Sequence, residues 1–281
     1  LSFYEINSAL TVNNFSSKVE LVPGHIAAAN STLSTPRSSV KFSAKMDNFD
    51  VFTDEGNSDV EKAVFSIDID ADTLDISDVY HFAEMPVAIE GKYIINGDIK
   101  GTLKEMKINE LHLHGMTADI NLSGKVFNLL GNEELRYDIQ LANTNLDNKT
   151  PGKILPEIDL SSIPDIGKIN IRSMDVVGNA DTVSANFDIA TSNAGSLSGK
   201  AGTRFGGTQT LIYSLNADVK NINLASIVGD KQLKSAFTGK IDFKGSGTVV
   251  EDMKFDFAVD LNKGSILGYE YSSFYTESNK I

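Results

Sequence analysis

The chain has 281 residues, of which 41% are hydrophobic and 22% are charged, a composition that excludes a disordered segment. It contains no cysteine, so disulfides and thiolate metal sites are excluded. The net charge of −13 argues against binding to nucleic acid or to an anionic membrane surface, because both need basic residues.

Alternation of apolar and polar residues is the dominant pattern along the chain, and it predicts half-buried β-strands. In the first run, Phe42, Ala44 and Met46 share one side of an extended segment. Similar runs follow at 67–71, 118–122, 135–141, 183–189, 213–219 and 255–261. Since one side of each run is apolar and the other polar, we expect antiparallel strands with one wet face.

Turns and short helices are predicted between these strands. Glycine-bearing pairs favour turns, and we assign them at 96–97, 206–207, 245–247 and 263–264. Helical spacing is limited to two short segments, 77–84 and 225–233, the first with Ser77 or Asp78 as its cap. The segment 151–164, which contains prolines, is predicted to be a loop or an irregular crossover.

The chain also repeats itself. Residues 66–97 align without a gap on 214–245, at an offset of 148, and the two predicted helices then occupy the same place in each copy. A weaker copy begins at about 137, where Ile139, Leu141 and Leu146 stand 72 positions after Ile67, Ile69 and Leu74. We therefore treat 66–110 and 214–260 as equivalent, although any two alternating strands align at even offsets.

A sheet with one apolar face must cover it, and the sequence leaves three ways open. The sheet can pack on a second sheet as a β-sandwich, close into a barrel, or curl into an open trough. Repeats favour growth along one axis. We therefore predict an all-β fold, an elongated curled antiparallel sheet with short helical interruptions, with the β-sandwich as the alternative.

The predicted trough would be lined by the apolar sides of the alternating strands. We assign its lining to Ile67, Ile69, Tyr93, Ile95, Phe187, Ile189, Leu215, Ile241, Phe243, Phe255, Phe257 and Val259. Acyl chains of phospholipids are the expected occupants, because burial of methylene groups is non-directional and worth about 0.8 kcal/mol per group. The alternative is that the same side chains form the packed core of a sandwich or barrel, without a bound lipid.

Catalytic and metal-binding patterns were not found, so we predict no enzyme activity, cofactor or metal. Asp68, Asp70 and Asp72 lack the glycine and glutamate of a calcium loop, and we assign them to the wet side of a strand. His112 and His114 share one side of a strand and would need a third ligand to bind zinc, so we interpret them as solvated.

The glycine-spaced strands resemble those of the TamB and AsmA-like family of Gram-negative envelope proteins. The resemblance rests on pattern and spacing over about residues 40–270, without a residue-level functional motif. It is carried by the segments 91–103 and 106–111, 167–171 with 183–189 and 195–199, and 222–230 with 237–241.

The resemblance implies a β-taco, a repeating β-groove, in a periplasmic protein anchored in the inner membrane. It further implies phospholipid transport between the inner and outer membranes. A second implied function is a scaffold for assembly of outer-membrane β-barrels with a partner barrel, as in a translocation and assembly module. A surface β-sandwich or adhesin is a third possibility.

The chain is expected to be one elongated segment, 1–281, taken from a longer protein. It begins with Leu rather than Met, and it lacks a run of 18 apolar residues that could serve as an anchor. The anchor and the contact with a partner barrel are therefore expected outside this segment.

Overall fold

The computed structural model describes residues 3–5, 10–50, 60–80, 91–129, 134–150, 165–206, 210–247 and 253–280. Within this part the chain is all-β and the strand pairs are antiparallel, so the predicted fold class is confirmed. The sixteen strands from β3 to β18 follow chain order in one open sheet, except that β18 pairs with β16 beside β17. The described strands do not include a second sheet of comparable size, so the sandwich alternative is not found there.

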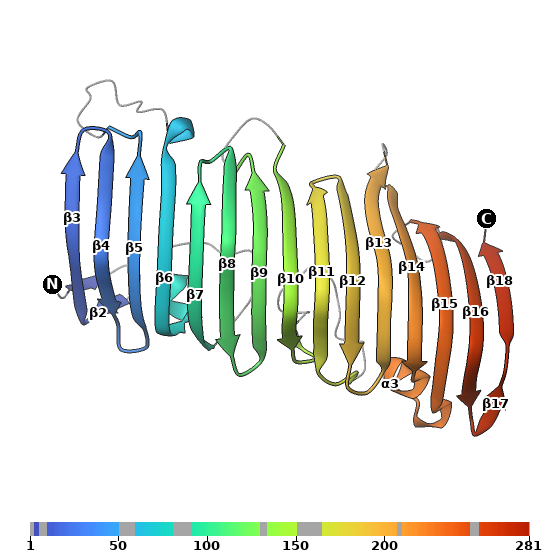
Figure 1. The fold of residues 1–281 in the computed structure, drawn as a ribbon. Helices are drawn as coiled ribbons and strands as arrows, with labels where there is room; N and C mark the ends of the chain where they lie inside the picture. The colour runs from blue at the N-terminus through green and yellow to red at the C-terminus, as the bar shows by residue number, and fades with distance from the viewer. Residues whose placement is uncertain are drawn as a thin grey trace. The chain divides into compact units, whose positions relative to one another are not determined.

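The chain divides into two compact units, and most of their strands are labelled in Figure 1. The first is Leu1–Ile139 with Lys153–Pro156, and the second is Gln140–Gly152 with Glu157–Ile281. The first unit contains β1 (Phe3–Glu5), β2 (Leu10–Val12), β3 (Asn14–Val22), β4 (His25–Ser34), β5 (Ser39–Asp47), β6 (Val64–Asp75), β7 (Lys92–Gly101), β8 (Glu105–Gly115) and β9 (Ala118–Phe127). Strand β10 (Arg136–Leu146) crosses the boundary between the units.

The second unit continues the up-and-down order. Its strands are β11 (Ile169–Asn179), β12 (Thr182–Thr191), β13 (Gly195–Gly206), β14 (Thr210–Ile222), β15 (Ser235–Ser246), β16 (Lys254–Ile266), β17 (Tyr269–Tyr271) and β18 (Phe274–Lys280). Because β17 and β18 both pair with β16, at Gly264–Ile266 and Phe255–Leu261, they form one interrupted outer strand.

Short helices interrupt the strands. The helices α1 (Ile76–Val79), α3 (Leu224–Val228) and η2 (Lys231–Leu233) lie close to the predicted places, whereas η1 (Val60–Lys62) was not predicted. The cap of α1 is Asp75, whose carboxylate accepts a hydrogen bond from the Ser77 backbone N–H at 3.1 Å, so the predicted caps Ser77 and Asp78 are wrong. Residues 81–84 of the predicted helix and the predicted loop 151–164 lie outside the described residues.

The same break in strand pairing occurs at the two places related by the 148-residue offset. A bulge separates Ala71 from Leu74 in β6, and another separates Val219 from Ile222 in β14, each just before a short helix. After the helices the offset changes, because Tyr93 lies opposite Leu74 whereas Phe237 lies opposite Ile222. The pairing thus relates Tyr93 to Phe237 at an offset of 144, and the gapless alignment is wrong beyond the helix.

Two of the predicted turns are wrong. Residues 96–97 lie inside β7 and residues 263–264 inside β16. Gly264 instead lies beneath the ring of Phe237, where a Cβ atom would approach Cδ1 to 2.6 Å. Glycine at this position allows the neighbouring side chain to approach the backbone closely. A sequence pattern does not distinguish such a glycine from one in a turn.

Candidate functional site

Strand register places the predicted apolar residues of the second unit on one face of its sheet. Directly paired residues share a face, and Leu215 pairs with Phe243, which pairs with Phe257. A second row runs through Ile241 and Val259. Phe187, Ile189 and Phe255 lie on the same face by the pairings of β11 to β16, so all eight predicted residues of this unit share it.

Aromatic rings are concentrated in one part of this face. The ring centroids of Tyr213 and Phe243 lie 5.6 Å apart, those of Phe243 and Phe255 6.2 Å, and those of Phe255 and Phe257 6.2 Å. These distances are within the range of attractive aromatic contacts. Tyr213 was not predicted as a site residue, although it belongs to the same alternating run as Leu215 and offered the same pattern.

The first unit has an equivalent face. Ile67 pairs with Ile99, and Ala71 pairs with Ile95, which pairs with Leu113. Ile69 and Tyr93 belong to the same face through their pairings with Gly97 and Leu74. The four predicted residues of this unit are therefore brought together, with Ile99, Leu111 and Leu113 as further members.

Burial varies along each face in the same way. In the first unit, Ala71, Tyr93 and Ile95, at the end of the strands next to α1, are buried, whereas Ile67 and Ile69 are only half-buried. In the second unit, Ala217, Val219 and Leu261, at the end next to α3, are buried. Each apolar face is thus closed at its helical end and partly open along the remaining rows.

The open rows of the second unit are Leu215–Phe243–Phe257 and Tyr213–Gly245–Phe255, whose members are all half-buried. Among the described residues, the principal contacts join strands that are neighbours in the sheet, and only short helices add to them. No described layer of the chain therefore packs across these rows. Three predicted residues, Tyr93, Ile95 and Phe187, are buried and are core positions instead.

An apolar cavity of about 210 Å³ lies at the helical end of the second unit's face. It is lined by Phe237, Leu261, Gly264, Ile266, Tyr271 and Phe274. An apolar cavity of about 150 Å³ already accommodates benzene. This one is large enough for a short stretch of hydrocarbon. The cavity was not predicted from the sequence, because Tyr271 and Phe274 belong to β17 and β18, which lie outside the predicted alternating runs.

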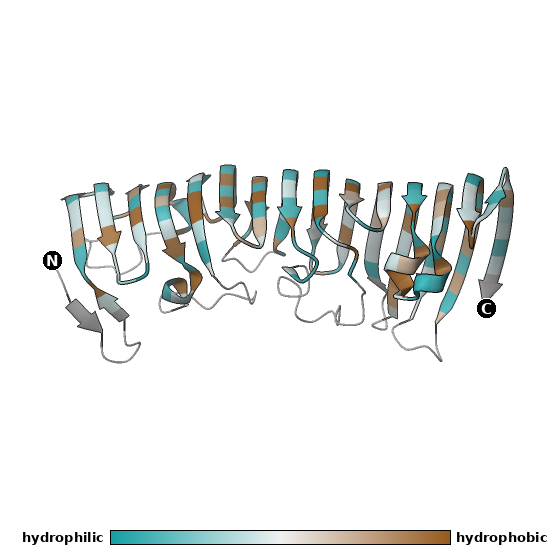
Figure 2. Ribbon diagram, turned by 90° about the horizontal axis from the view of Figure 1, so that it is seen from below, coloured by the Kyte–Doolittle hydropathy of each residue, from teal (hydrophilic) through white to brown (hydrophobic). Residues whose placement is uncertain are grey.

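The opposite face is polar and charged by the strand register. Hydrophilic and hydrophobic residues both occur along the strands of the sheet (Figure 2). In the second unit, Lys200, Asn216 and Asp242 are paired in one row of this face. In the first unit, Asp68, Asp70 and Asp72 are exposed on it, at the wet positions predicted for them.

Polar groups are thus sorted to one side of each unit and apolar groups to the other. The apolar rows can bind hydrocarbon by burial alone, because their side chains offer no charge to orient a substrate. None of the described helices is both long and apolar enough to cross a membrane. Comparisons with models of protein families, with characterised proteins and with solved structures found no match to this chain.

Proposed function

We propose that the chain is a non-enzymatic lipid-binding segment that holds phospholipid acyl chains on its apolar faces. In the wider protein it would serve as part of a periplasmic route for phospholipid between the inner and outer membranes, anchored in the inner membrane by another segment. The observation that carries the proposal is the half-buried row Leu215–Phe243–Phe257, across which no described part of the chain packs. The resemblance to TamB and AsmA-like proteins points in the same direction.

Hydrocarbon suits these rows because their attraction is non-directional. Burial of apolar surface contributes roughly 25 cal/mol per Å², or about 0.8 kcal/mol per methylene group. Neighbouring positions on the face are chemically alike, so an acyl chain loses little when it moves from one row to the next. This equivalence supports movement along a face better than retention at one site.

Photocrosslinking of the whole chain tests the proposal. Benzoylphenylalanine at Phe243 is expected to label phospholipid, whereas the same probe at the adjacent Lys244, on the polar face, is not. Replacement of Phe257 by Glu should also reduce the lipid that co-purifies and is detected by native mass spectrometry. Asp256→Asn on the polar face is the matched control and should leave it unchanged.

Equal lipid labelling at Phe243 and Lys244 in the folded protein would refute the proposal, as would full lipid retention in F257E. Circular dichroism of each variant shows whether the sheet is still formed. Both positions belong to the second unit, so the test does not depend on the first.

A second candidate function, a scaffold for outer-membrane β-barrel assembly, is favoured by the edge strand β3. Among the described strands it pairs only with β4, and Val19, Leu21 and Val22 are exposed on it. An exposed edge strand can pair with an extended polypeptide. A probe at Val19 would then trap an unfolded barrel strand, and labelling at Phe243 would yield peptide rather than lipid.

A further inference from the structure

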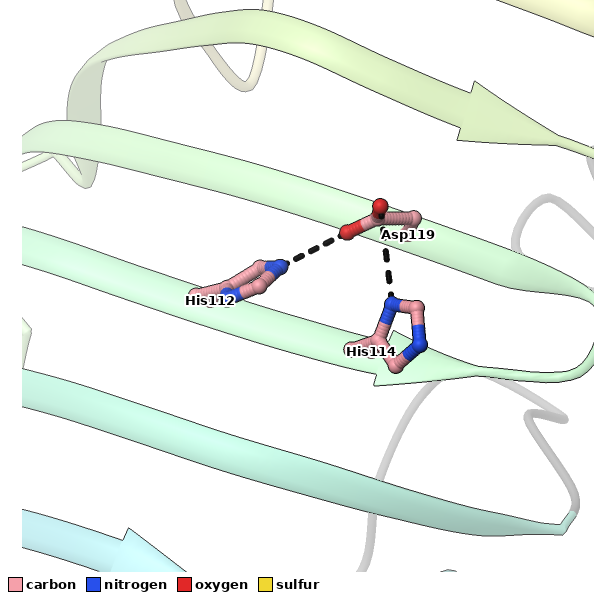
Figure 3. A group of neighbouring side chains, drawn as sticks. All are labelled: His112, His114 and Asp119. Atoms are coloured by element: carbon pink, nitrogen blue, oxygen red, sulfur yellow. Dashed lines mark hydrogen bonds and ion pairs between the residues drawn. The ribbon is translucent and has the colours of Figure 1, made fainter.

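A histidine–aspartate cluster lies on the polar face of the first unit, opposite the apolar face of the same unit. His112 and His114 lie two residues apart on β8, so both side chains project from the same face. Asp119 lies on β9 directly opposite His114, because the turn between the two strands is short. Both imidazole rings point toward the Asp119 carboxylate (Figure 3).

The three side chains converge closely. His112 Nε2 lies 2.7 Å from Asp119 Oδ1, and His114 Nδ1 lies 3.5 Å from Asp119 Oδ2. One ligand atom from each residue can be chosen so that all three lie within 4.8 Å of one another. Small rotations of partly exposed side chains are enough to bring such atoms around one ion at bonding distances of about 2.0–2.2 Å.

We infer that His112, His114 and Asp119 form a binding site for a divalent transition metal of the zinc class. Two imidazole nitrogens and one carboxylate oxygen are a donor set that Zn²⁺ uses, with water completing a tetrahedron. Imidazole also suits Fe, Ni and Cu, whereas Mg²⁺ and Ca²⁺ prefer oxygen ligands. The inference does not depend on the proposed lipid function, since the cluster lies on the polar face of the first unit and the apolar residues of that unit lie on its other face.

An acidic residue lies beside the cluster on the same face. Glu110 precedes His112 by two residues and lies opposite Asp98 on β7, whose carboxylate is paired with Lys100 at 3.0 Å. Residues Asn96 and Asn121, which pair with His112 on either side, are uncharged. The side chains of His112, His114 and Asp119 are 39%, 55% and 33% exposed, so an ion and its waters can enter from solvent.

A bound ion would join β8 to β9 across their turn. It would replace the contacts of the two imidazoles with the carboxylate by bonds to the metal, which requires both imidazoles to be neutral. The hairpin would then be held by three metal bonds in addition to its backbone ladder. Its backbone amides should become more protected from exchange.

The chain supplies a matched control in a second histidine–aspartate pair. His25 Nδ1 lies 2.5 Å from Asp47 Oδ1, in the pairing of β4 with β5. The described residues do not place a second imidazole in a ligand cluster with this pair. Replacement of His25 therefore removes an equally close contact without removing a ligand of the inferred site.

Isothermal titration of the tag-free chain with ZnCl₂ tests the inference. One ion per chain is expected at micromolar concentration, with at least a tenfold loss of affinity in H112A and in D119N and no change in H25A. Co²⁺ should give the visible absorption of a tetrahedral site, and Mg²⁺ should give no heat. Hydrogen exchange should slow in 105–127 on addition of Zn²⁺ to the wild type only.

Two results would overturn the inference. One is the absence of saturable Zn²⁺ binding by the folded wild-type chain. The other is unchanged stoichiometry and affinity in the H112A/D119N double variant, which would place the ion elsewhere in the chain. Circular dichroism of the variants establishes that a loss of binding is not a loss of the sheet.

Discussion

Replacement of Asp78 by Asn should destabilise the first unit by about 3 kcal/mol at neutral pH. The Asp78 side chain is 4% exposed and accepts hydrogen bonds from Thr35 Oγ1 and Ser38 Oγ, both at 2.6 Å. Arg37 adds contacts from Nε at 3.0 Å and from a terminal nitrogen at 2.5 Å. These contacts fasten α1 to the β4–β5 connection.

The size of this loss depends on which partners of Asp78 can be solvated after the substitution. Breaking a buried ion pair costs about 3–5 kcal/mol, and Arg37 is 46% exposed, so its charge can return to solvent and the lower end of that range applies. Thr35 and Ser38 are buried and would keep hydroxyl groups facing an amide that is a poorer acceptor. Asp72→Asn is the control, because Asp72 is 69% exposed and its ion pair with the exposed Lys41 spans 3.6 Å.

The loss should also depend on pH. Burial of Asp78 opposes its ionisation, but the hydrogen bonds from Ser38, Thr35 and Arg37 outweigh it and lower the pKa of Asp78. A lowered pKa stabilises the folded state above the unfolded pKa of about 3.9, and this contribution disappears as the pH falls through the folded value. The difference between wild type and D78N should therefore shrink below about pH 4.

Urea unfolding followed by circular dichroism, with hydrogen exchange of 30–50 and 64–80, measures both effects. A loss below about 1 kcal/mol at pH 7 would refute the proposed role of the Asp78 contacts. A difference that stays constant from pH 7 to pH 3 would refute the argument from ionisation.

Two further substitutions test the packing and the surface charges. Gly115→Ala should lower the free energy of unfolding by about 1–3 kcal/mol, because the new Cβ would lie 2.6 Å from the Tyr93 ring. Gly202→Ala is the control and should cost much less, since its Cβ meets the nearest atom at 3.4 Å. Equal urea midpoints for the two variants would contradict this prediction. Arg172 lies 2.7 Å from Asp188, but both side chains are exposed. Arg172→Met should therefore change the free energy of unfolding by less than about 1 kcal/mol. A larger loss in the same urea assay would contradict this prediction.

The faces of the sheet were predictable from sequence because they depend on a local period. Alternation decides which side of a strand is apolar, and antiparallel pairing then aligns those sides across strands. For this reason Leu215, Phe243 and Phe257 could be assigned to one surface without knowledge of their register. The degree to which these side chains are buried could not be predicted. It depends on the helices at one end of the strands and on whether another layer covers the face, and neither is encoded in the alternation.

Glycine was the main source of error in the strand boundaries. Gly97 and Gly264 follow polar residues and look like turns, yet each lies mid-strand beneath a large neighbour, Leu111 or Phe237. The reason is a contact between strands, which a local pattern does not contain. The change of offset from 148 to 144 after the helices has the same origin, because it appears only in the pairing.

The grouping of His112 and His114 with Asp119 could not be predicted for a related reason. His112 and His114 were visible as a pair, but the third residue of the cluster lies on another strand. Asp119 reaches them because the β8–β9 turn is short enough to place it opposite His114. A prediction of that hairpin with its register would have placed Asp119 beside the two histidines.

The chemistry of the open rows also bears on what can cover them. A folded protein partner forms about one hydrogen bond per 100–200 Å² of interface, in addition to apolar contacts. From Val176 to Phe257 the row Val176–Ala185–Ala201–Leu215–Phe243–Phe257 offers no polar side chain, and its backbone groups already take part in the ladder. Its outer end is the polar Ser278 of β18, which pairs with Phe257. An occupant between Val176 and Phe257 therefore gains no side-chain hydrogen bonds, a condition that an acyl chain meets and that a second folded domain meets poorly. This is the physical reason to test lipid first at Phe243.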